Sequence, residues 1–391
     1  MNVASTSGIK VRANGNGMSD SLTTADVKRL LNDPSAVVRE ELATKLARHF
    51  NQGKLSAAER QLAEDIFRTL ARSAAERVRR ALSENLKDNP TLPADVALTL
   101  ARDIDRVALP ILECSMVLSD ADLIAIVRDS GVKKQLAIAR RATVSAAVSE
   151  ALVESDRIEV LSTLLENEGA ALLEPQLMKM LDRHAKQDDV QMPMARRGVL
   201  PATVLERLVA QASLELSEIL IARNDIPPRL ARVLAIQVRE DATVELLPLG
   251  TPTSEIAAFV AHLRLSGRLS PSLLIRAMCS GDLVFVEVAF SILAGVPLRN
   301  AKLLLHDIGL LGFHSLFERS GMEKALLPLF RSALNIVFDE PFEGGEDKRD
   351  WYRRRTVQRL LQQFEHVGAG DLDYLVEKIL EDGAVGQKLG A

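Results

Sequence analysis

The sequence predicts an all-α protein, in which a solenoid of helix pairs with a period of about 26 residues is followed by a more compact carboxy-terminal helical bundle. Of the 391 residues, 47% are hydrophobic but only 4% are aromatic, which is typical of helices filled by Ala, Leu and Val. A polar residue recurs at a nearly constant interval, and apolar residues keep the same distance from it each time. Such periodicity indicates stacked repeats rather than a single globular core.

The repeat is anchored on one polar position in each unit. Steps of 26 residues, interrupted by one step of 30, connect Asn89, Ser115, Arg141, Asn167, Arg197 and Arg223. The position three residues further on is apolar each time: Leu92, Leu118, Val144, Ala170, Leu200 and Ile226. The next residue is Pro, Ser or Ala, and both Pro and Ser suit the start of a helix. We therefore expect each unit to contain a helix, a short polar turn and a second helix.

The expected helices are amphipathic. Val204 and Leu208 are four residues apart and lie on one face of an expected second helix, as Leu82 and Leu86 do on an expected first helix. Neither helix of a pair can bury its apolar stripe alone, so neighbouring units must stack.

Two parts of the chain resemble known families. SAVVREELATKLA, which follows Asp33-Pro34, and ERVRRALSENL, residues 76–86, resemble the HEAT-repeat pattern. GRLSPSLLIRAMCSGD, AGVPL and LLLHD, within residues 267–307, resemble a bacterial domain-of-unknown-function family built from HEAT-like helical repeats. The resemblance covers most of the chain after about residue 25. It implies a HEAT-like α-solenoid without an established activity, and it supplies no catalytic or binding residues.

Changes in composition predict the domain boundaries. Residues 1–20 are rich in Ser, Gly and Asn and are expected to form a disordered lead. We expect the HEAT-like α-solenoid over residues 21–240 and a carboxy-terminal helical domain over residues 241–340. Residues 341–350 form an acidic linker, and residues 351–391 are expected to hold terminal helices, the last running through Tyr374 to Leu380, and a frayed tail.

Charge and cysteine content exclude several classes of protein. The 49 basic and 53 acidic residues give a net charge of −4, which argues against a globally basic nucleic-acid binder. Cys114 and Cys279 are far apart and are expected to be buried core residues rather than disulfide or zinc ligands. No apolar run is long enough for a signal peptide or a membrane span. We expect a cytoplasmic protein without a cofactor.

No catalytic motif is evident in the sequence. A Gly-rich nucleotide loop and a nucleophile elbow are both absent. His306-Asp307 resembles the opening of a metal phosphohydrolase motif, and His314 is close in the sequence. Eight residues along a helix place the two histidines on different faces, so we interpret them as structural residues at a helix end. The sequence predicts neither an enzyme nor a metal site.

Basic residues at the turns are candidates for binding a partner: Arg140, Arg141, Arg196, Arg197 and Arg223. In stacked units they would line up into a ridge for acidic protein segments or nucleic-acid phosphates. The alternative is that the turn tolerates any polar residue, since Asn and Ser occupy it in other units. The helix-pair fold itself does not predict an arginine there, so this position is the first place to look for function.

Trp351, Tyr352 and Arg353 are the remaining candidate partner-binding residues. They open the basic stretch WYRRRTVQR, which contains the only Trp of the chain. Aromatic residues beside arginines can stack on bases or anchor a protein interface. Two alternatives are an intramolecular clasp with the preceding acidic residues, Glu340 among them, and a solvated helix start whose ring packs on the bundle.

The sequence favours a non-catalytic protein-interaction scaffold or regulatory adaptor with a protein partner, because solenoids offer long surfaces and no reactive constellation is present. A nucleic-acid-binding protein that uses the arginine edge is the main alternative, and an unrecognised enzyme is the third. The oligomeric state stays open.

Overall fold

The computed structural model describes residues 35–53, 55–222, 227–307 and 311–364. The expected lead at residues 1–20, Arg223, and the expected last helix and tail lie outside these ranges. The chain divides into two compact units, Met1–Arg197 and Gly198–Ala391. We call them the first unit and the second unit and describe each by itself.

The first unit confirms the all-α prediction. Its regular structure in the described residues is helical, apart from one parallel β-bridge between Val144 and Ala170. Its helices are α2 (Ala36–Asn51), α3 (Ala57–Ala71), α4 (Glu76–Leu86), α5 (Ala94–Ala101), α6 (Asp105–Cys114), α7 (Asp120–Asp129), α8 (Val132–Ala139), α9 (Ala146–Glu154), α10 (Ile158–Glu166), α11 (Glu174–Arg183) and α12 (Asp188–Ala195).

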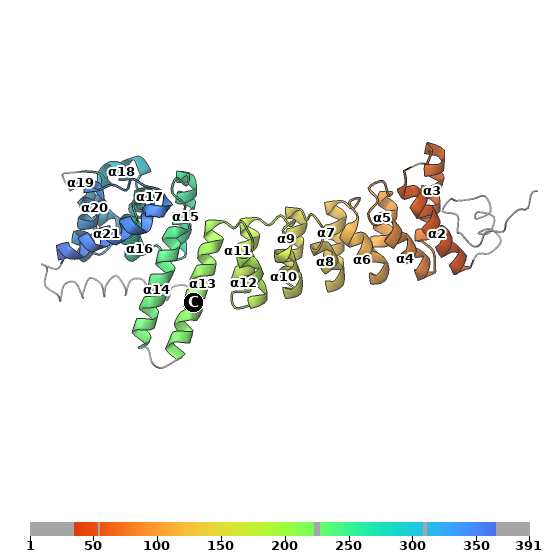
Figure 1. The fold of residues 1–391 in the computed structure, drawn as a ribbon, viewed down its shortest axis with the longest axis horizontal. Helices are drawn as coiled ribbons and strands as arrows, with labels where there is room; N and C mark the ends of the chain where they lie inside the picture. Colours follow the sequence, from red (N-terminus) through yellow and green to blue (C-terminus); the bar gives the residue numbers. More distant parts are fainter. Residues whose placement is uncertain (1–34, 54, 223–226, 308–310, 365–391) are drawn as a thin grey trace, which may run out of the picture. The chain divides into compact units, whose positions relative to one another are not determined.

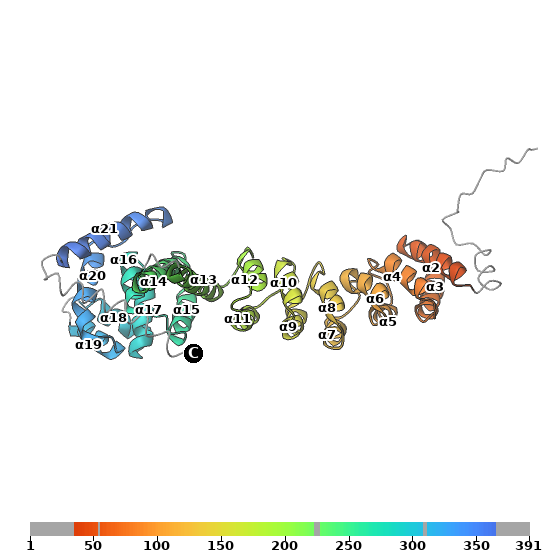
Figure 2. The same ribbon diagram turned by 90° about the horizontal axis from the view of Figure 1, so that it is seen from below.

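Helices of the first unit lie in two rows (Figures 1 and 2). α4, α6, α8, α10 and α12 contact one another in succession, and each contacts the helix that precedes it in the second row. Leu82, Leu86, Ile111, Leu112 and Ile138 of the first row are fully buried. The apolar stripes that are four residues apart in the sequence therefore meet between neighbouring helices, where removal of apolar surface from water stabilises the stack.

The predicted helix starts are confirmed at several turns. Pro93 and Pro227 directly precede α5 and α14, and the Ser119 and Ser145 hydroxyls accept hydrogen bonds from the third backbone N–H of α7 and α9. These residues act locally, because Pro lacks the N–H that the first helical turn leaves unpaired and Ser bonds one of the others. At Ala171 the helix begins later, at Glu174 of α11.

The second unit contains longer helices and a thicker core. Its elements are α13 (Ala202–Ala222), α14 (Pro228–Glu245), α15 (Thr253–Leu265), α16 (Pro271–Cys279), α17 (Leu283–Ala294), α18 (Leu298–Leu305), α19 (Leu311–Ser320), the 3₁₀ turn η1 (Lys324–Leu326), α20 (Leu327–Asp339) and α21 (Glu346–Phe364). α17 lies in the middle of the core, where the Phe290 ring meets the Phe313 and Phe330 rings edge-on at centroid distances of 5.7 and 6.0 Å.

The division between the units differs from the boundary expected at residue 240. The sequence predicts helix pairs through residue 240, but Val204, Leu208, Leu216 and Leu220 all lie on the single 21-residue helix α13. No Pro or Gly interrupts this stretch, so nothing ends the helix where the shorter helices of the first unit end. α13 contacts α14 and α15 and belongs to the second unit.

Candidate functional site

The Arg141 side chain points into the first unit. Its Nη1 donates a hydrogen bond to the Leu112 carbonyl oxygen at 2.6 Å, and its Nη2 donates to the Ser115 carbonyl oxygen at 2.7 Å. Both acceptors lie at the end of α6, where the last carbonyls of a helix have no partner within it. Arg141 is 6% exposed, and burial lowers the pKa of its guanidinium. This arginine therefore stabilises the turn of the preceding repeat.

Asn167 and Arg197 make the same kind of contact one and two turns later, respectively. Arg197 donates to the carbonyl oxygens of Leu165, Asn167 and Ala170 at 2.9 to 3.0 Å. Asn167 Nδ2 donates to the Arg141 carbonyl oxygen at 2.8 Å. The anchor position thus forms a ladder in which a side chain bonds carbonyls of the previous turn. The interpretation that the fold does not use this arginine is corrected for Arg141 and Arg197, because both guanidinium groups satisfy backbone carbonyls.

Replacing Arg141 by Met, which retains the alkyl stem, should destabilise the first unit by about 2 kcal/mol, because two buried carbonyl groups lose their donor. Hydrogen exchange of the α6 amides is a suitable measurement, since the single Trp of the chain lies in the second unit. Arg140→Met is the matched control at an exposed neighbour, with an expected effect within about 0.5 kcal/mol. Equal losses in the two variants would contradict the ladder.

Arg140 and Arg196 differ from Arg141 and Arg197. They cap the carboxy-terminal ends of α8 and α12, and both side chains are exposed. Neither side chain has a hydrogen bond or ion pair with any described residue. Two of the arginines that the sequence singles out are therefore open to a partner. Arg223, the fifth, lies outside the described residues.

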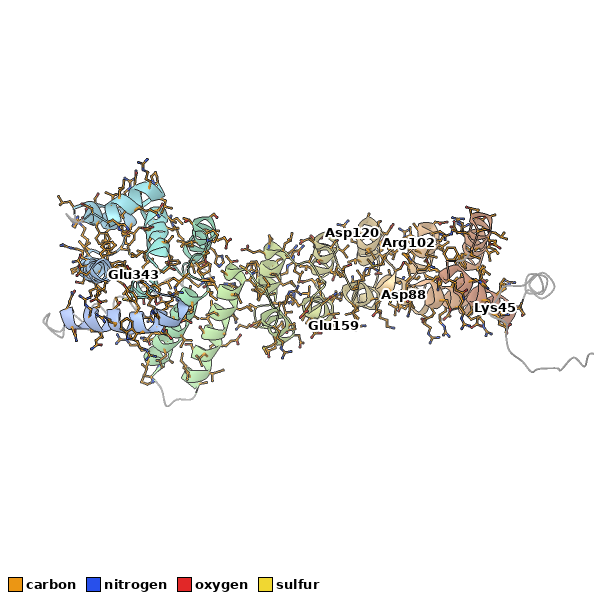
Figure 3. The ribbon with its side chains drawn as sticks, turned by 45° about the horizontal axis from the view of Figure 1, so that its top comes forward. Lys45, Asp88, Arg102, Asp120, Glu159 and Glu343 are labelled. Atoms are coloured by element: carbon orange, nitrogen blue, oxygen red, sulfur yellow. The ribbon has the colours of Figure 1, made fainter. Side chains whose placement is uncertain are left out.

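A cavity of about 410 Å³ lies between two turns of the first unit. One wall comes from the segment before α7 and its first turn, where Asp120 is labelled in Figure 3. The other wall comes from the residues around the β-bridge. The lining side chains are mostly apolar with a few polar groups: Met116, Leu118, Asp120, Leu123, Arg141, Thr143, Val144, Ser145, Val148, Gly169 and Ala171.

The β-bridge uses the backbone of Val144 on one side of its strand. Val144 donates to the Gly169 carbonyl oxygen at 3.1 Å and accepts from the Ala171 N–H at 2.9 Å. A Cβ at Gly169 would stand 2.0 Å from the Ala142 carbonyl oxygen, so the close approach of the two segments requires glycine there. Because successive residues of an extended segment direct their N–H and C=O groups to opposite sides, those of Thr143 point away from the bridge.

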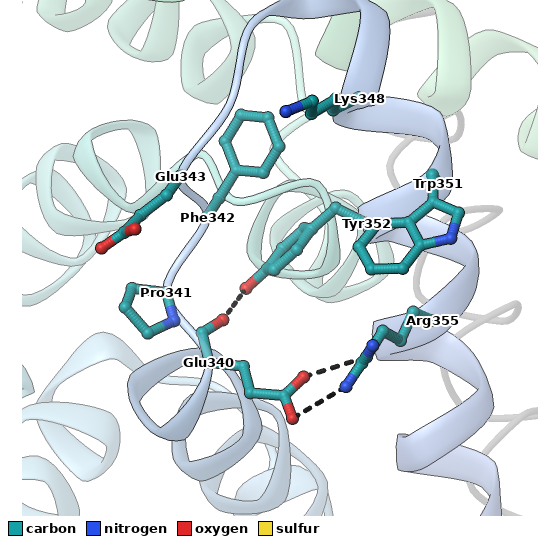
Figure 4. Close-up of a pocket in the computed structure, with 8 residues that line it drawn as sticks. All are labelled: Glu340, Pro341, Phe342, Glu343, Lys348, Trp351, Tyr352 and Arg355. Atoms are coloured by element: carbon teal, nitrogen blue, oxygen red, sulfur yellow. Dashed lines mark hydrogen bonds and ion pairs between the residues drawn. The ribbon is translucent and has the colours of Figure 1, made fainter.

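Trp351, Tyr352 and Arg353 lie in the second turn of α21, and Trp351 and Tyr352 line a cavity of about 230 Å³ (Figure 4). The Tyr352 hydroxyl donates to the Glu340 carbonyl oxygen at 2.8 Å, and its ring is buried against Phe342. Trp351 is 61% exposed, with the Arg355 guanidinium 5.3 Å from its ring centroid. It is therefore Tyr352, rather than the Trp, whose ring packs on the bundle.

Ion pairs join α21 to neighbouring acidic residues. Arg355 and Arg359 each pair with the Glu340 carboxylate at 3.0 Å, and these hydrogen bonds lower the pKa of Glu340. Arg353 pairs with Asp350 at 2.9 Å and with Glu245 of α14 at 3.4 Å. The basic stretch thus makes an intramolecular clasp, and Glu340 is its main acceptor.

His306 and His314 have separate partners. His306 ends α18, where its Nε2 lies 2.9 Å from Glu287 Oε1 and its ring stacks on Phe338 at 4.7 Å. His314 Nδ1 lies 3.9 Å from Glu318. A cavity of about 300 Å³ adjoins His306. In the described part of the chain, no group of three or more His, Cys, Asp or Glu side chains is arranged to hold a metal ion.

Sequence reasoning missed two buried carboxylates of the second unit. Glu206 is fully buried on α13, where Arg268 donates to both of its oxygens at 2.6 Å and His262 lies at 3.2 Å. Glu240 on α14 accepts from Ser270, Ser272 and Arg276 at 2.5, 2.6 and 3.1 Å.

A signal for Glu206 exists in the sequence: it is in helical phase with the small buried residues Ala210, Ser213 and Ser217. Burial raises its pKa, but the hydrogen bonds from His262 and Arg268 outweigh this and lower it. Both carboxylates are fully occupied by partners in the protein, so we assign them a structural role.

Within the described residues, no single helix has the length and apolar composition needed to cross a membrane. α17 and α18 satisfy that test together, by length and composition only, and are bent by 114° at their junction.

One family model matches the chain. It describes an uncharacterised protein conserved in bacteria (DUF2336), and the match extends over residues 107–368, which is more than half of the chain. No curated protein and no solved structure matches.

Proposed function

We propose that this chain, which belongs to the bacterial DUF2336 family of uncharacterised proteins, is a non-catalytic interaction scaffold of the cytoplasm. In this proposal the first unit is a HEAT-like solenoid of helix pairs with a period of about 26 residues, held together by the ladder at the anchor position. The second unit presents a surface for an amphipathic helix of a partner protein. The observation that carries the proposal is the distribution of side chains on α13 and α14.

α13 and α14 form an antiparallel hairpin (Figure 1), and small residues are buried along much of its length. Ala210, Ser213 and Ser217 of α13 are buried, as are Ala231 and Ala235 of α14. Small residues allow the two backbones to approach closely. Several of the large apolar side chains of both helices lie outside this seam.

Several large apolar side chains are exposed on one side of the hairpin, and Leu214 of α13, which is 43% exposed, lies on the other side. Leu216 and Ile219 of α13, and Leu230, Leu234 and Val238 of α14, are all partly or largely exposed. At about 100° per residue, Leu216 and the set on α14 lie roughly a quarter turn from the seam of their own helix, and Ile219 lies further round α13 on the same side. Because the helices are antiparallel, both sets face the same side. We call this surface the hairpin face.

The position of α21 sets one end of the hairpin face. Asp241 and Glu245 continue the line of Leu234 and Val238 along α14, and both pair with Arg353 of α21. α21 therefore covers the last turns of this line, and the stretch before them is free of charged side chains. A charge-depleted apolar surface above the seam of two helices suits a third helix that packs its ridge into their groove.

Ile219→Glu should weaken capture of the partner at least tenfold, because a charge would be buried in the centre of the contact. The measurement is quantitative affinity capture from a lysate of the native bacterium, followed by titration of the purified partner. Leu265→Glu is the matched control, since Leu265 lies in the same unit and is 90% exposed. Unchanged capture by Ile219→Glu would overturn the proposal, and a dimer in light scattering that this change dissociates would identify the partner helix as a second copy.

The exposed Arg140 and Arg196 favour nucleic-acid binding as the alternative function. That function predicts duplex binding that falls steeply with salt and weakens further in Arg140→Gln and Arg196→Gln, with the hairpin face uninvolved.

A further inference from the structure

We propose that the first unit has a second, independent binding site: the cavity between the turn at residues 116–118 and the bridge segment at residues 143–145 accepts an extended acidic peptide segment, which pairs with the backbone of Thr143. The site lies outside the hairpin face and does not depend on it.

The first argument is the unpaired edge of the strand. Val144 uses its N–H and C=O for the bridge to residues 169–171, so the outward groups are those of Thr143. Within the described residues, the Thr143 N–H and C=O have no hydrogen-bond partner. An unpaired strand edge is a template on which another extended segment adds by backbone hydrogen bonds.

The second argument is the space beside that edge. A cavity of about 410 Å³ adjoins this segment, with Thr143 among its lining residues. Its opposite wall includes Leu118, whose backbone also lacks a partner among the described residues. Met116, Leu123 and Val148 line the cavity with apolar surface. An added segment would therefore insert one apolar side chain while its backbone pairs with Thr143.

The third argument is the charge at the base of the cavity. Arg141 lines it, and its guanidinium is held by two carbonyl oxygens but by no carboxylate of the described residues within salt-bridge distance. The side chain of the adjacent Arg140 is exposed, and it too has no carboxylate of the described residues within salt-bridge distance. A carboxylate on the added segment would complement the Arg141 cation, and a charge-assisted hydrogen bond to a buried guanidinium is stronger than a neutral one. Asp120 on the opposite wall disfavours a second carboxylate at that side.

The test starts from a display library of linear 12-residue peptides selected on the full chain. We expect enriched peptides to share an apolar residue close to an acidic one. The highest-affinity synthetic peptide should bind Met116→Glu at least tenfold more weakly than the wild type in fluorescence polarisation. Leu62→Glu is the matched control, because Leu62 and Met116 are 61% and 67% exposed in the same unit.

Backbone pairing is tested by changing the peptide rather than the protein. A loss of binding then cannot be caused by misfolding of a protein variant. N-methylation should weaken binding at alternate positions, because successive N–H groups of an extended segment point to opposite sides. Hydrogen exchange of the Thr143 amide should slow in the complex. The proposal is overturned if selection yields no peptide that distinguishes Met116→Glu from Leu62→Glu, or if N-methylation shows no alternation. Ile219→Glu should leave this affinity unchanged, which separates the site from the hairpin face.

Discussion

Glu206→Ala is expected to destabilise the second unit by about 3–5 kcal/mol, because it leaves the buried Arg268 guanidinium without its carboxylate. Arg268 donates to both Glu206 oxygens at 2.6 Å and also approaches His262, so the remaining groups would be two nitrogen-bearing side chains facing one another. Urea unfolding followed by the fluorescence of Trp351 measures this loss, since the only Trp of the chain lies in the second unit.

Glu218→Ala is the control for this experiment. Glu218 lies on the same helix, its side chain is exposed, and it has no partner among the described residues, so its loss should change the free energy of unfolding by no more than about 0.5 kcal/mol. A loss below about 1 kcal/mol for Glu206→Ala would show that the network contributes no more than an exposed ion pair does.

The same carboxylate makes stability depend on pH. The pKa of Glu206 is lowered in the folded protein, so the unfolded chain binds more protons between the two pKa values and the free energy of unfolding rises with pH there. The contribution of Glu206 is present above its unfolded pKa, near 4.5, and is lost as the pH falls toward the folded pKa. Glu206→Gln should therefore flatten the acid limb of the stability profile.

Helix starts were predictable because their causes are local. Pro93 and Ser145 each act on the first turn of the helix that follows, so the sequence within a few residues contains the whole signal. The long helix α13 was not predictable, because the 26-residue spacing of apolar positions continues through a helix that has no turn in its middle. A repeat in the sequence shows which positions are equivalent, but a turn also requires a residue that ends the helix.

The candidate site shows the same division between local and distant causes. A polar residue at a turn is expected to face water, yet Arg141 bonds carbonyls 26 and 29 residues earlier in the chain. Glu206 depends on partners 56 and 62 residues later. The cavity beside Thr143 arises from the bridge between Val144 and Ala170, which belong to successive turns. None of these pairings can be read from one segment alone, because each depends on how neighbouring units stack.

Phe290→Ala is expected to cost the second unit about 3–5 kcal/mol, the range for removing a large aromatic side chain from a well-packed core. Phe290 is fully buried on α17 and contacts the rings of Phe313, Phe317 and Phe330, which come from α19 and α20. The loss combines the removed burial of the ring with the cavity left behind, because α19 and α20 cannot both collapse into the space. Urea unfolding followed by Trp351 fluorescence gives the change in free energy.

Phe338→Ala provides the comparison for Phe290→Ala. Phe338 is partly exposed at the end of α20 and stacks on His306 alone, so the expected loss is about 1 kcal/mol. The ratio of the two losses tests whether α17 is the centre of the core. If Phe290→Ala costs no more than Phe338→Ala, the edge-on contacts around Phe290 contribute little, and the second unit must draw its stability from the buried ion pairs of α13 and α14 instead.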